Sequence, residues 1–204
     1  MYLFGGSGHC KVIIDIIKKS KKELIEGIFD DYPRFDSILD VPVFETKSID
    51  SFIDKKLIIA IGNNELRQKI SKKISAIFIT AIHPNAIVSC DVKINEGTVV
   101  MAGVILNSSV LVGKHCIINT GAVIDHDCII NDFVHISPNA SLAGDVLVGE
   151  GSQIGIGATV IQGVKIGKWV TVGAGAVIIK DVPDYAVIVG NPGKIIKYNS
   201  KENE

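Results

Sequence analysis

The sequence predicts two folded units, a Rossmann-like α/β domain over residues 1–81 and an all-β parallel β-helix over residues 82–204. Two observations lead to this prediction. Strand-like and helix-like apolar segments alternate in the first eighty residues, which is typical of a small parallel sheet. An unbroken six-residue repeat fills most of the remainder, and a repeat of fixed period indicates a solenoid.

The N-terminal unit begins with a short apolar strand at Tyr2–Phe4. A glycine-rich turn follows, and then a helical stripe made by the isoleucines at positions 13, 14, 16 and 17. Ile25–Phe29 is the second expected strand. Val41–Phe44, which contains Pro42, is expected at an edge of the sheet, because proline cannot donate to a strand ladder.

Two further elements complete this unit. Leu57–Ile61 is expected to be a buried strand. Asn64–Ser75 is an amphipathic helix whose apolar spacing turns Leu66, Ile70 and Ile74 inward. Residues 77–81 then lead into the repeat.

The repeat consists of two columns of residues in phase. Every sixth residue from Ile82 to Ile178 is Ile, Leu or Val, which gives 17 consecutive positions. Four residues after each of them lies a small or β-branched residue, from Ala86 to Val182. Period six fits neither a helix nor a simple strand, but it fits a short strand that buries one bulky side chain and then turns a corner. Three such hexads close a triangular coil, and coils stack at about 4.8 Å, the spacing of paired strands.

Composition excludes several classes of function. The 21 Lys and Arg residues against 22 Asp and Glu give a net charge of -1, so no basic surplus favours a nucleic acid partner. No apolar run reaches the length of a membrane-spanning helix, and Gly5, Gly6 and Gly8 interrupt any signal-peptide pattern. The four cysteines form no CxxC pair, so we expect free thiols and a cytoplasmic protein without membrane insertion.

Three loops are expected to meet at one edge of the N-terminal sheet. The Gly5–His9 turn joins a strand to a helix, where backbone N–H groups can approach a phosphate. Asp30 and Asp31 end the second strand, and Gly62 follows a third. The carboxyl ends of parallel strands share an edge, so the pattern predicts a nucleotide cleft. The alternative is that the glycines only shape a tight turn and the two acids form a solvated corner.

His126 is the candidate general base, because Asp125 and Asp127 flank it. A carboxylate beside an imidazole stabilises the imidazolium that forms when a proton is taken. In an 18-residue coil Gly144 lies directly above His126, where an exposed backbone N–H could stabilise an oxyanion. The alternative for a single histidine is a surface turn residue.

A metal centre is the competing hypothesis from another chemical class. His115, His126 and His135 are separated by 11 and 9 residues, and neither spacing is a multiple of the 18-residue coil. Metal ligands must converge around one ion. We therefore expect no metal site within a single chain.

The chain resembles a known family over nearly its whole length. The motifs that carry the resemblance are Gly5-Gly6-Ser7-Gly8-His9, Phe29-Asp30-Asp31, Ala60-Ile61-Gly62-Asn63-Asn64-Glu65, Ile82-His83-Pro84 and the hexads of residues 82–196. Together they are similar to the NeuD/PglD-type left-handed β-helix sugar acetyltransferases, and most similar to the UDP-4-amino-sugar N-acetyltransferases. The resemblance implies a left-handed coil, acetyl-CoA as co-substrate and a homotrimer.

The resemblance also implies roles for individual residues. His126 would be the base, and Asp127 would raise its basicity, although bacillosamine-type relatives have glutamate at that position. The acetyl-CoA contacts would come from His135, Gly144, Ile156 and Ala174. The nucleotide-sugar contacts would come from Ser7, Gly8, His9, Asp30, Asp31 and Gly62.

The expected function is N-acetylation of the 4-amino group of a UDP-linked amino-deoxy sugar in bacterial glycan synthesis. The alternatives are O-acetylation of a sialic-type sugar, N-acetylation of a GDP-linked amino sugar, and a catalytically silent nucleotide-sugar-binding module. We expect the active sites to lie between subunits, because the prism has outward apolar residues that a monomer would leave wet. These residues are Val99, Ile105, Ile117, Ile129 and Ile161.

Overall fold

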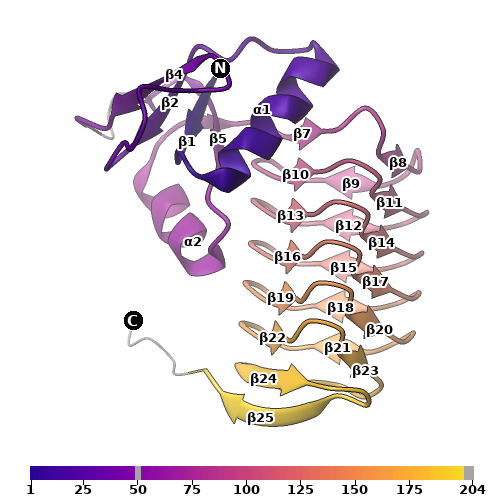
Figure 1. The fold of residues 1–204 in the computed structure, drawn as a ribbon. Coiled ribbons are helices and arrows are strands. Elements are labelled where there is room, and N and C mark those ends of the chain that lie inside the picture. The colour runs from indigo at the N-terminus through magenta and orange to yellow at the C-terminus, as the bar shows by residue number, and fades with distance from the viewer. Residues whose placement is uncertain (49–51, 200–204) are drawn as a thin grey trace.

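The structure, a computed structural model, describes residues 1–48 and 52–199, and it places an α/β domain beside a column of stacked coils (Figure 1). The strands of the N-terminal sheet lie in the order β3-β4-β2-β1-β5-β6. All neighbours are parallel except the β3–β4 hairpin. The strands are β1 (Tyr2–Phe4), β2 (Gly27–Asp30), β3 (Ser37–Ile38), β4 (Val41–Glu45), β5 (Lys56–Ile59) and β6 (Ile77–Phe78).

The predicted parallel sheet is therefore confirmed, with one correction at its edge. The expected edge strand, β4, lies inside the sheet because β3 pairs with it on its outer side. Pro42 is tolerated in β4 because its partner there is Ser37 of β3. Strand β3 has only two residues, so the missing N–H does not interrupt a long ladder.

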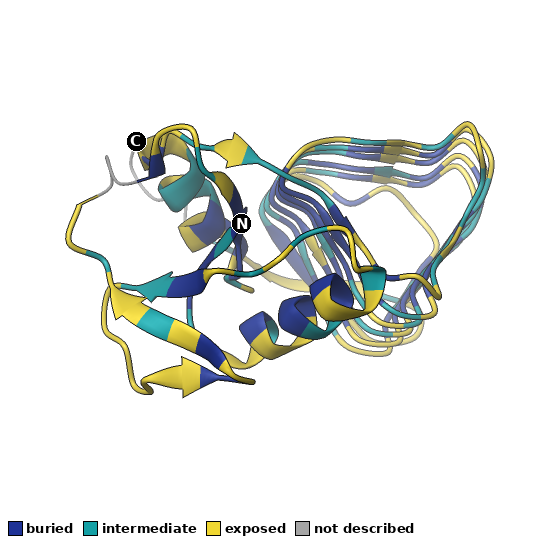
Figure 2. Cartoon of the chain, turned by 90° about the horizontal axis from the view of Figure 1, so that it is seen from above, coloured by how far each residue is buried: buried dark blue, intermediate teal, exposed yellow. Residues whose placement is uncertain are grey.

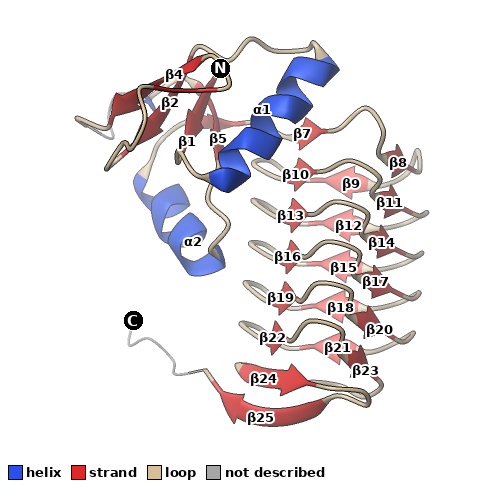
Figure 3. Ribbon diagram, viewed as in Figure 1, coloured by secondary structure: helices blue, strands red, loops and turns tan. Residues whose placement is uncertain are grey.

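The two helices lie beside the upper and middle coils (Figure 3). The first, α1 (Gly8–Ser20), buries the predicted isoleucine stripe and contacts the first strand of the coils. The second, α2 (Asn64–Lys73), begins after Asn63, whose side chain accepts a hydrogen bond from the Leu66 backbone N–H at 2.8 Å. Within the described residues, neither helix is long and apolar enough to span a bilayer.

The apolar face of α2 differs from the prediction. Leu66 is 46% exposed, whereas the next residue, Arg67, is only 1% exposed. Ile74 is buried and Ile70 is half-buried, as expected. Relative to the prediction, α2 is rotated about its own axis so that Arg67 faces the coils. The reason is that α2 packs against backbone carbonyl groups, which need hydrogen-bond donors rather than an apolar partner.

The coils contain seventeen two-residue strands that start six residues apart and form three parallel sheets, here called faces 1, 2 and 3. Face 1 contains β7 (Ala81–Ile82), β10 (Val99–Val100), β13 (Ile117–Ile118), β16 (His135–Ile136), β19 (Gln153–Ile154) and β22 (Thr171–Val172). Face 2 contains β8 (Ile87–Val88), β11 (Ile105–Leu106), β14 (Val123–Ile124), β17 (Ser141–Leu142), β20 (Thr159–Val160) and β23 (Val177–Ile178). Face 3 contains β9 (Lys93–Ile94), β12 (Leu111–Val112), β15 (Ile129–Ile130), β18 (Leu147–Val148) and β21 (Lys165–Ile166).

Pairing along each face confirms the 18-residue coil. Val99 pairs with Ala81 and with Ile117, and the same step continues to the last coil. There β24 (Ala186–Val189) joins face 1, followed by the antiparallel strand β25 (Lys194–Tyr198). The predicted left-handed parallel β-helix is thus present, and its strand β7 begins one residue before position 82.

The interior of the β-helix follows the predicted columns. The bulky column is buried from Val100 to Ile178 and forms one continuous core. Ile82 is 39% exposed, while Val88 and Ile94 are half-buried. These three residues belong to the first coil, which has a neighbouring coil on one side only.

Two residues that were expected on the solvent-exposed outer surface of the prism are instead buried. Val99 and Ile117 are each 1% exposed, because they pack with the N-terminal domain in a second core. Seen from above, the dark buried strands of face 1 lie toward that domain (Figure 2). Ile129 is 40% exposed, and Ile105 and Ile161 are half-buried. The chain's own α/β domain therefore covers the upper part of face 1, at β7, β10 and β13.

Candidate active site

His126 lies at the corner between faces 2 and 3, in the turn from β14 to β15. Asp125 shapes this turn, because its Oδ1 accepts hydrogen bonds from the His126 backbone N–H and from Asn107 Nδ2 on the adjacent coil, both at 2.8 Å. Asp127 takes a positive φ of 61° and places its Oδ2 2.7 Å from His126 Nδ1. The two carboxylates thus act differently: Asp125 holds the backbone and Asp127 holds the ring.

The electrostatics of this corner favour a basic imidazole. The hydrogen bond that Asp127 Oδ2 accepts from protonated His126 Nδ1 raises the pKa of His126, and the Asp125 charge adds to the effect. Because Nδ1 is engaged by Asp127, Nε2 is the nitrogen left to accept a substrate proton. Both side chains are 60% exposed, so the corner is open in a single chain.

Gly144 lies beside the His126 ring on the neighbouring coil. A Cβ at Gly144 would lie 2.6 Å from both His126 Nε2 and Cε1, which is too close for any side chain. The glycine therefore makes room for the imidazole as well as leaving its backbone accessible. This placement follows the 18-residue step, and a 2.9 Å bond from the Asp145 N–H to the His126 carbonyl joins the same two coils.

The predicted nucleotide loops meet at the carboxyl edge of the N-terminal sheet. Asp30 Oδ2 accepts the Gly6 N–H at 2.6 Å, and its Oδ1 accepts the Tyr32 N–H at 2.9 Å. Both carboxylate oxygens are thus engaged in holding the glycine turn to the loop after β2. Four candidates are exposed at this edge: Ser7, Gly8, Asp31 and Gly62.

His9 and His135 lie close enough to interact electrostatically. The sequence predicts different ligands for them, the nucleotide sugar for His9 and acetyl-CoA for His135. His9 is in the first turn of α1, and its buried Nε2 has no hydrogen-bond partner. His135 is on face 1, with its Nε2 3.0 Å from Asn119 Nδ2. Burial and the Arg67 charge lower the pKa of His9 to about 4, and burial, Arg67 and His9 lower that of His135 to about 3. Both rings therefore lie within reach of the Arg67 charge, where the α/β domain meets face 1.

Ile156 and Ala174 lie at a third place, the corner between faces 1 and 2. They are on successive coils, since the Gly175 N–H donates to the Ile156 carbonyl at 2.8 Å, and both are exposed. Face 2 separates them from the His126 corner. One chain therefore does not bring the catalytic candidates together with these two acetyl-CoA candidates.

Comparison with known proteins identifies the chain's relatives. The family described as the PglD N-terminal domain matches residues 1–74, and bacterial transferase hexapeptide (six repeats) matches residues 145–180. Perosamine N-acetyltransferase from Caulobacter crescentus, solved with CoA and GDP-perosamine, is 40% identical, with 96% of each chain covered and a TM-score of 0.91. The chain belongs to this family of PglD-type sugar N-acetyltransferases.

Two further proteins are similar to this PglD-type chain. The acetyltransferase domain of PglB from Neisseria gonorrhoeae, solved with acetyl coenzyme A, is 35% identical over 96% of this chain and 98% of that one, with a TM-score of 0.88. UDP-N-acetylbacillosamine N-acetyltransferase of Bacillus subtilis (strain 168) is 39% identical over 108 residues, 49% of this chain. That alignment spans 50% of the length of the curated relative.

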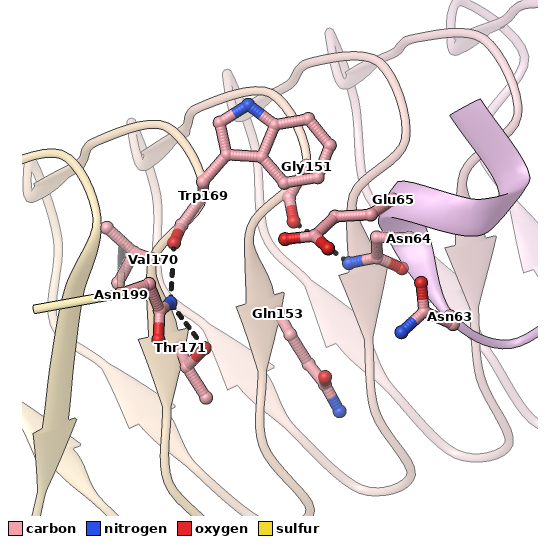
Figure 4. A pocket seen from close by; sticks show the side chains of 9 residues that line it. All are labelled: Asn63, Asn64, Glu65, Gly151, Gln153, Trp169, Val170, Thr171 and Asn199. Atoms are coloured by element: carbon pink, nitrogen blue, oxygen red, sulfur yellow. Dashed lines mark hydrogen bonds between the residues drawn. The ribbon is translucent and has the colours of Figure 1, made fainter. Parts of the chain in front are cut away.

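A cavity of about 330 Å³ lies between the start of α2 and the corner between faces 3 and 1 (Figure 4). Trp169 and Gln153 line its prism side, and Asn63 and Glu65 line its helix side. Asn199 closes one end, donating from Nδ2 to the Trp169 carbonyl at 3.1 Å. Sequence reasoning missed this cavity, because its walls come from three distant segments that share no motif.

Sequence reasoning also missed Arg67, which the structure buries against the loop after β5. An arginine in an amphipathic helix is expected to face water, and no neighbouring acid marked it as exceptional. As to metals, no group of three or more His, Cys, Asp or Glu side chains able to hold an ion occurs within residues 1–48 and 52–199.

Proposed function

We propose that this PglD-type protein transfers the acetyl group of acetyl-CoA to the 4-amino group of a UDP-linked amino-deoxy sugar for bacterial glycan synthesis. The observation that carries the proposal is the His126–Asp127 pair, with Nδ1 held at 2.7 Å, Nε2 beside Gly144 and the His126 side chain 60% exposed. The names of the relatives, all sugar N-acetyltransferases or bound to CoA, support the same chemistry. The cytoplasmic location stays a prediction from the cysteine pattern.

In this proposal His126 Nε2 accepts a proton from the attacking amine as its nitrogen bonds to the acetyl carbonyl carbon. The carbon–sulfur bond of the thioester then breaks, and the imidazolium returns the proton to the departing thiolate. Asp127 stabilises the imidazolium between these two transfers. The Gly144 backbone N–H stabilises the negative charge that develops on the carbonyl oxygen.

The active site is completed by a second subunit in this proposal. His126 is at one corner, Ile156 and Ala174 are at another, and the predicted nucleotide loops belong to the α/β domain, which packs on face 1. A neighbouring prism in a homotrimer would bring the His126 corner of one chain to the nucleotide loops of another. Closed cyclic symmetry allows every subunit to make the same contact.

A GDP-linked amino sugar is the second candidate acceptor. The relative solved with GDP-perosamine matches 96% of the chain, whereas the UDP-sugar relative aligns with only 49% of it. Both candidates require the same acetyl transfer to an amine. They differ in the base that the N-terminal cleft must accept and in the sugar that is linked to it.

The test is release of the CoA thiol from acetyl-CoA in the presence of UDP-, GDP- and CMP-linked sugars. Release only with a UDP-linked 4-amino sugar supports the first proposal, and release only with a GDP-linked one selects the second. Release with a CMP-linked or free sialic-type sugar that has no amine would instead indicate O-acetylation. No release with any sugar that demonstrably binds would show a silent binding module and overturn the proposal.

A further inference from the structure

Arg67 of α2 is buried with all five of its N–H donors used. Its side chain is 1% exposed, and burial lowers its pKa to about 10. None of the ion pairs found among the described residues includes it. A buried charge without an opposite charge is costly, so its retention calls for a role beyond packing.

The first set of acceptors lies on the prism. Arg67 Nε donates to the His115 carbonyl at 2.8 Å, and Nη2 donates to the Phe133 carbonyl at 2.9 Å. These residues are 18 positions apart on successive coils, both with positive φ at the corner between faces 3 and 1. Asn64 Nδ2 extends the row by donating to the Gly151 carbonyl at 3.0 Å on the next coil (Figure 4).

The second set of acceptors lies on the nucleotide loop. Arg67 Nη1 donates to the carbonyls of Ile61 at 3.0 Å and Gly62 at 3.2 Å, just after β5. Nη2 also donates to Asn64 Oδ1 at 2.8 Å, which holds the amide in place for its own bond to the prism. One rigid guanidinium therefore joins the loop after β5 to two coils.

We propose that Arg67 is a positioning residue that fixes the nucleotide-binding loop at Gly62 in register with the β-helix. The inference rests on the proposed function, since it takes that loop to contact the nucleotide. The loop and the Gly5–His9 turn share one sheet edge, and α1, which begins in that turn at Gly8, contacts β7 of face 1. The guanidinium thus sets how far the bound nucleotide lies from the prism. Its charge also contributes to the low pKa values of His9 and His135, after burial.

The experiment compares Arg67→Met, Arg67→Lys and the control Lys72→Met, which removes an exposed cation from the same helix. Calorimetry with UDP and with GDP gives nucleotide affinity, and calorimetry with CoA gives affinity for the second ligand. We expect Arg67→Met to raise the nucleotide Kd and the KM for the sugar acceptor about tenfold or more, with CoA affinity changed less than about threefold. Arg67→Lys keeps the charge but only three donors, so it should fall between wild type and Arg67→Met. Lys72→Met should match wild type.

Unfolding is monitored by circular dichroism. If Arg67→Met does not melt cooperatively, the nucleotide affinity of Arg67→Lys tests the proposal instead. A folded Arg67→Lys variant with wild-type nucleotide affinity overturns the proposal. Equal losses for nucleotide and CoA also overturn it, since they indicate general damage. A wild-type protein that binds neither UDP nor GDP overturns it too. Nucleotide binding by a wild-type protein that transfers no acetyl group contradicts only the proposed function and leaves the role of Arg67 intact.

Discussion

The ring of His126 is held at its Nδ1 by a neighbour in sequence and rests on a glycine one coil away. Each contact has a separate function. Asp127 raises the pKa of the imidazole, and Gly144 leaves the space in which the ring lies. Two predictions at the scale of single residues distinguish these effects.

The first concerns the base and its carboxylate. His126→Ala should lower kcat by about 10²–10⁴, with the nucleotide-sugar affinity nearly unchanged. Asp127→Asn should lower kcat by a smaller factor than His126→Ala does. Because Asp127 raises the pKa of His126, its loss lowers that pKa, so the unprotonated base persists to lower pH. The acidic limb of the kcat/KM profile should therefore move to lower pH. An unmoved limb would show that Asp127 does not tune the base.

The second concerns Gly144. In Gly144→Ala the new Cβ would lie 2.6 Å from His126 Nε2, so the ring must turn away from its place beside Asp127. We expect kcat to fall by about tenfold to a hundredfold, while thermal stability changes little because the ring is exposed. Steady-state kinetics and a melting curve measure both effects. Unchanged kcat in the folded variant would mean that the position of the ring shown here is not the one used in catalysis.

At the scale of elements, Ser7 and Gly8 at the start of α1 are exposed to solvent at the proposed nucleotide-binding edge of the sheet. A Cβ at Gly8 would meet no atom of the chain within 4 Å. A loss of binding in Gly8→Ala would therefore come from contact with the ligand rather than from a clash within the chain.

Gly8→Val should accordingly weaken nucleotide binding about tenfold or more, because a branched side chain would occupy the space of a phosphate. CoA affinity and the melting temperature should stay close to those of the wild type. Calorimetry with UDP and GDP tests the prediction. Asp30→Ala is a comparison variant that frees the Gly6 and Tyr32 N–H groups and so loosens the same edge from within. Full nucleotide affinity in Gly8→Val would place the phosphates elsewhere.

At the scale of the whole molecule, the three groups of candidate residues lie on different corners and faces of one prism. Exposed apolar side chains of the prism include Ile87 on face 2 at 65%, Ile129 on face 3 at 40%, and Ile156 at the corner between faces 1 and 2 at 59%. Burying such side chains between prisms is favourable by about 25 cal/mol for each Å² of apolar surface removed from water.

We therefore expect light scattering to give a mass of about three times the 21.8 kDa chain. Mixing His126→Ala chains with chains inactivated in the nucleotide loop by Gly8→Val should restore part of the activity, because mixed trimers contain some sites with both intact parts. A fully active monomer of about 21.8 kDa would contradict a site shared between subunits.

The sequence by itself determined the β-helix and the local surroundings of His126. A strict period of six residues fixes which side chains point inward and which residues lie one coil apart, so Gly144 could be placed beside His126 without coordinates. The adjacent acids Asp125 and Asp127 needed no tertiary information either.

Only the tertiary structure decided how the α/β domain lies on the prism. It buried Val99 and Ile117, brought His9 toward His135, and turned Arg67 inward where Leu66 was expected. The physical reason is that the position of one domain on another depends on contacts between segments far apart in the chain. The carbonyls of His115 and Phe133 accept hydrogen bonds from Arg67 because the corner of the coil turns them outward. A backbone acceptor does not depend on the residue type, so a repeat in the sequence cannot indicate it.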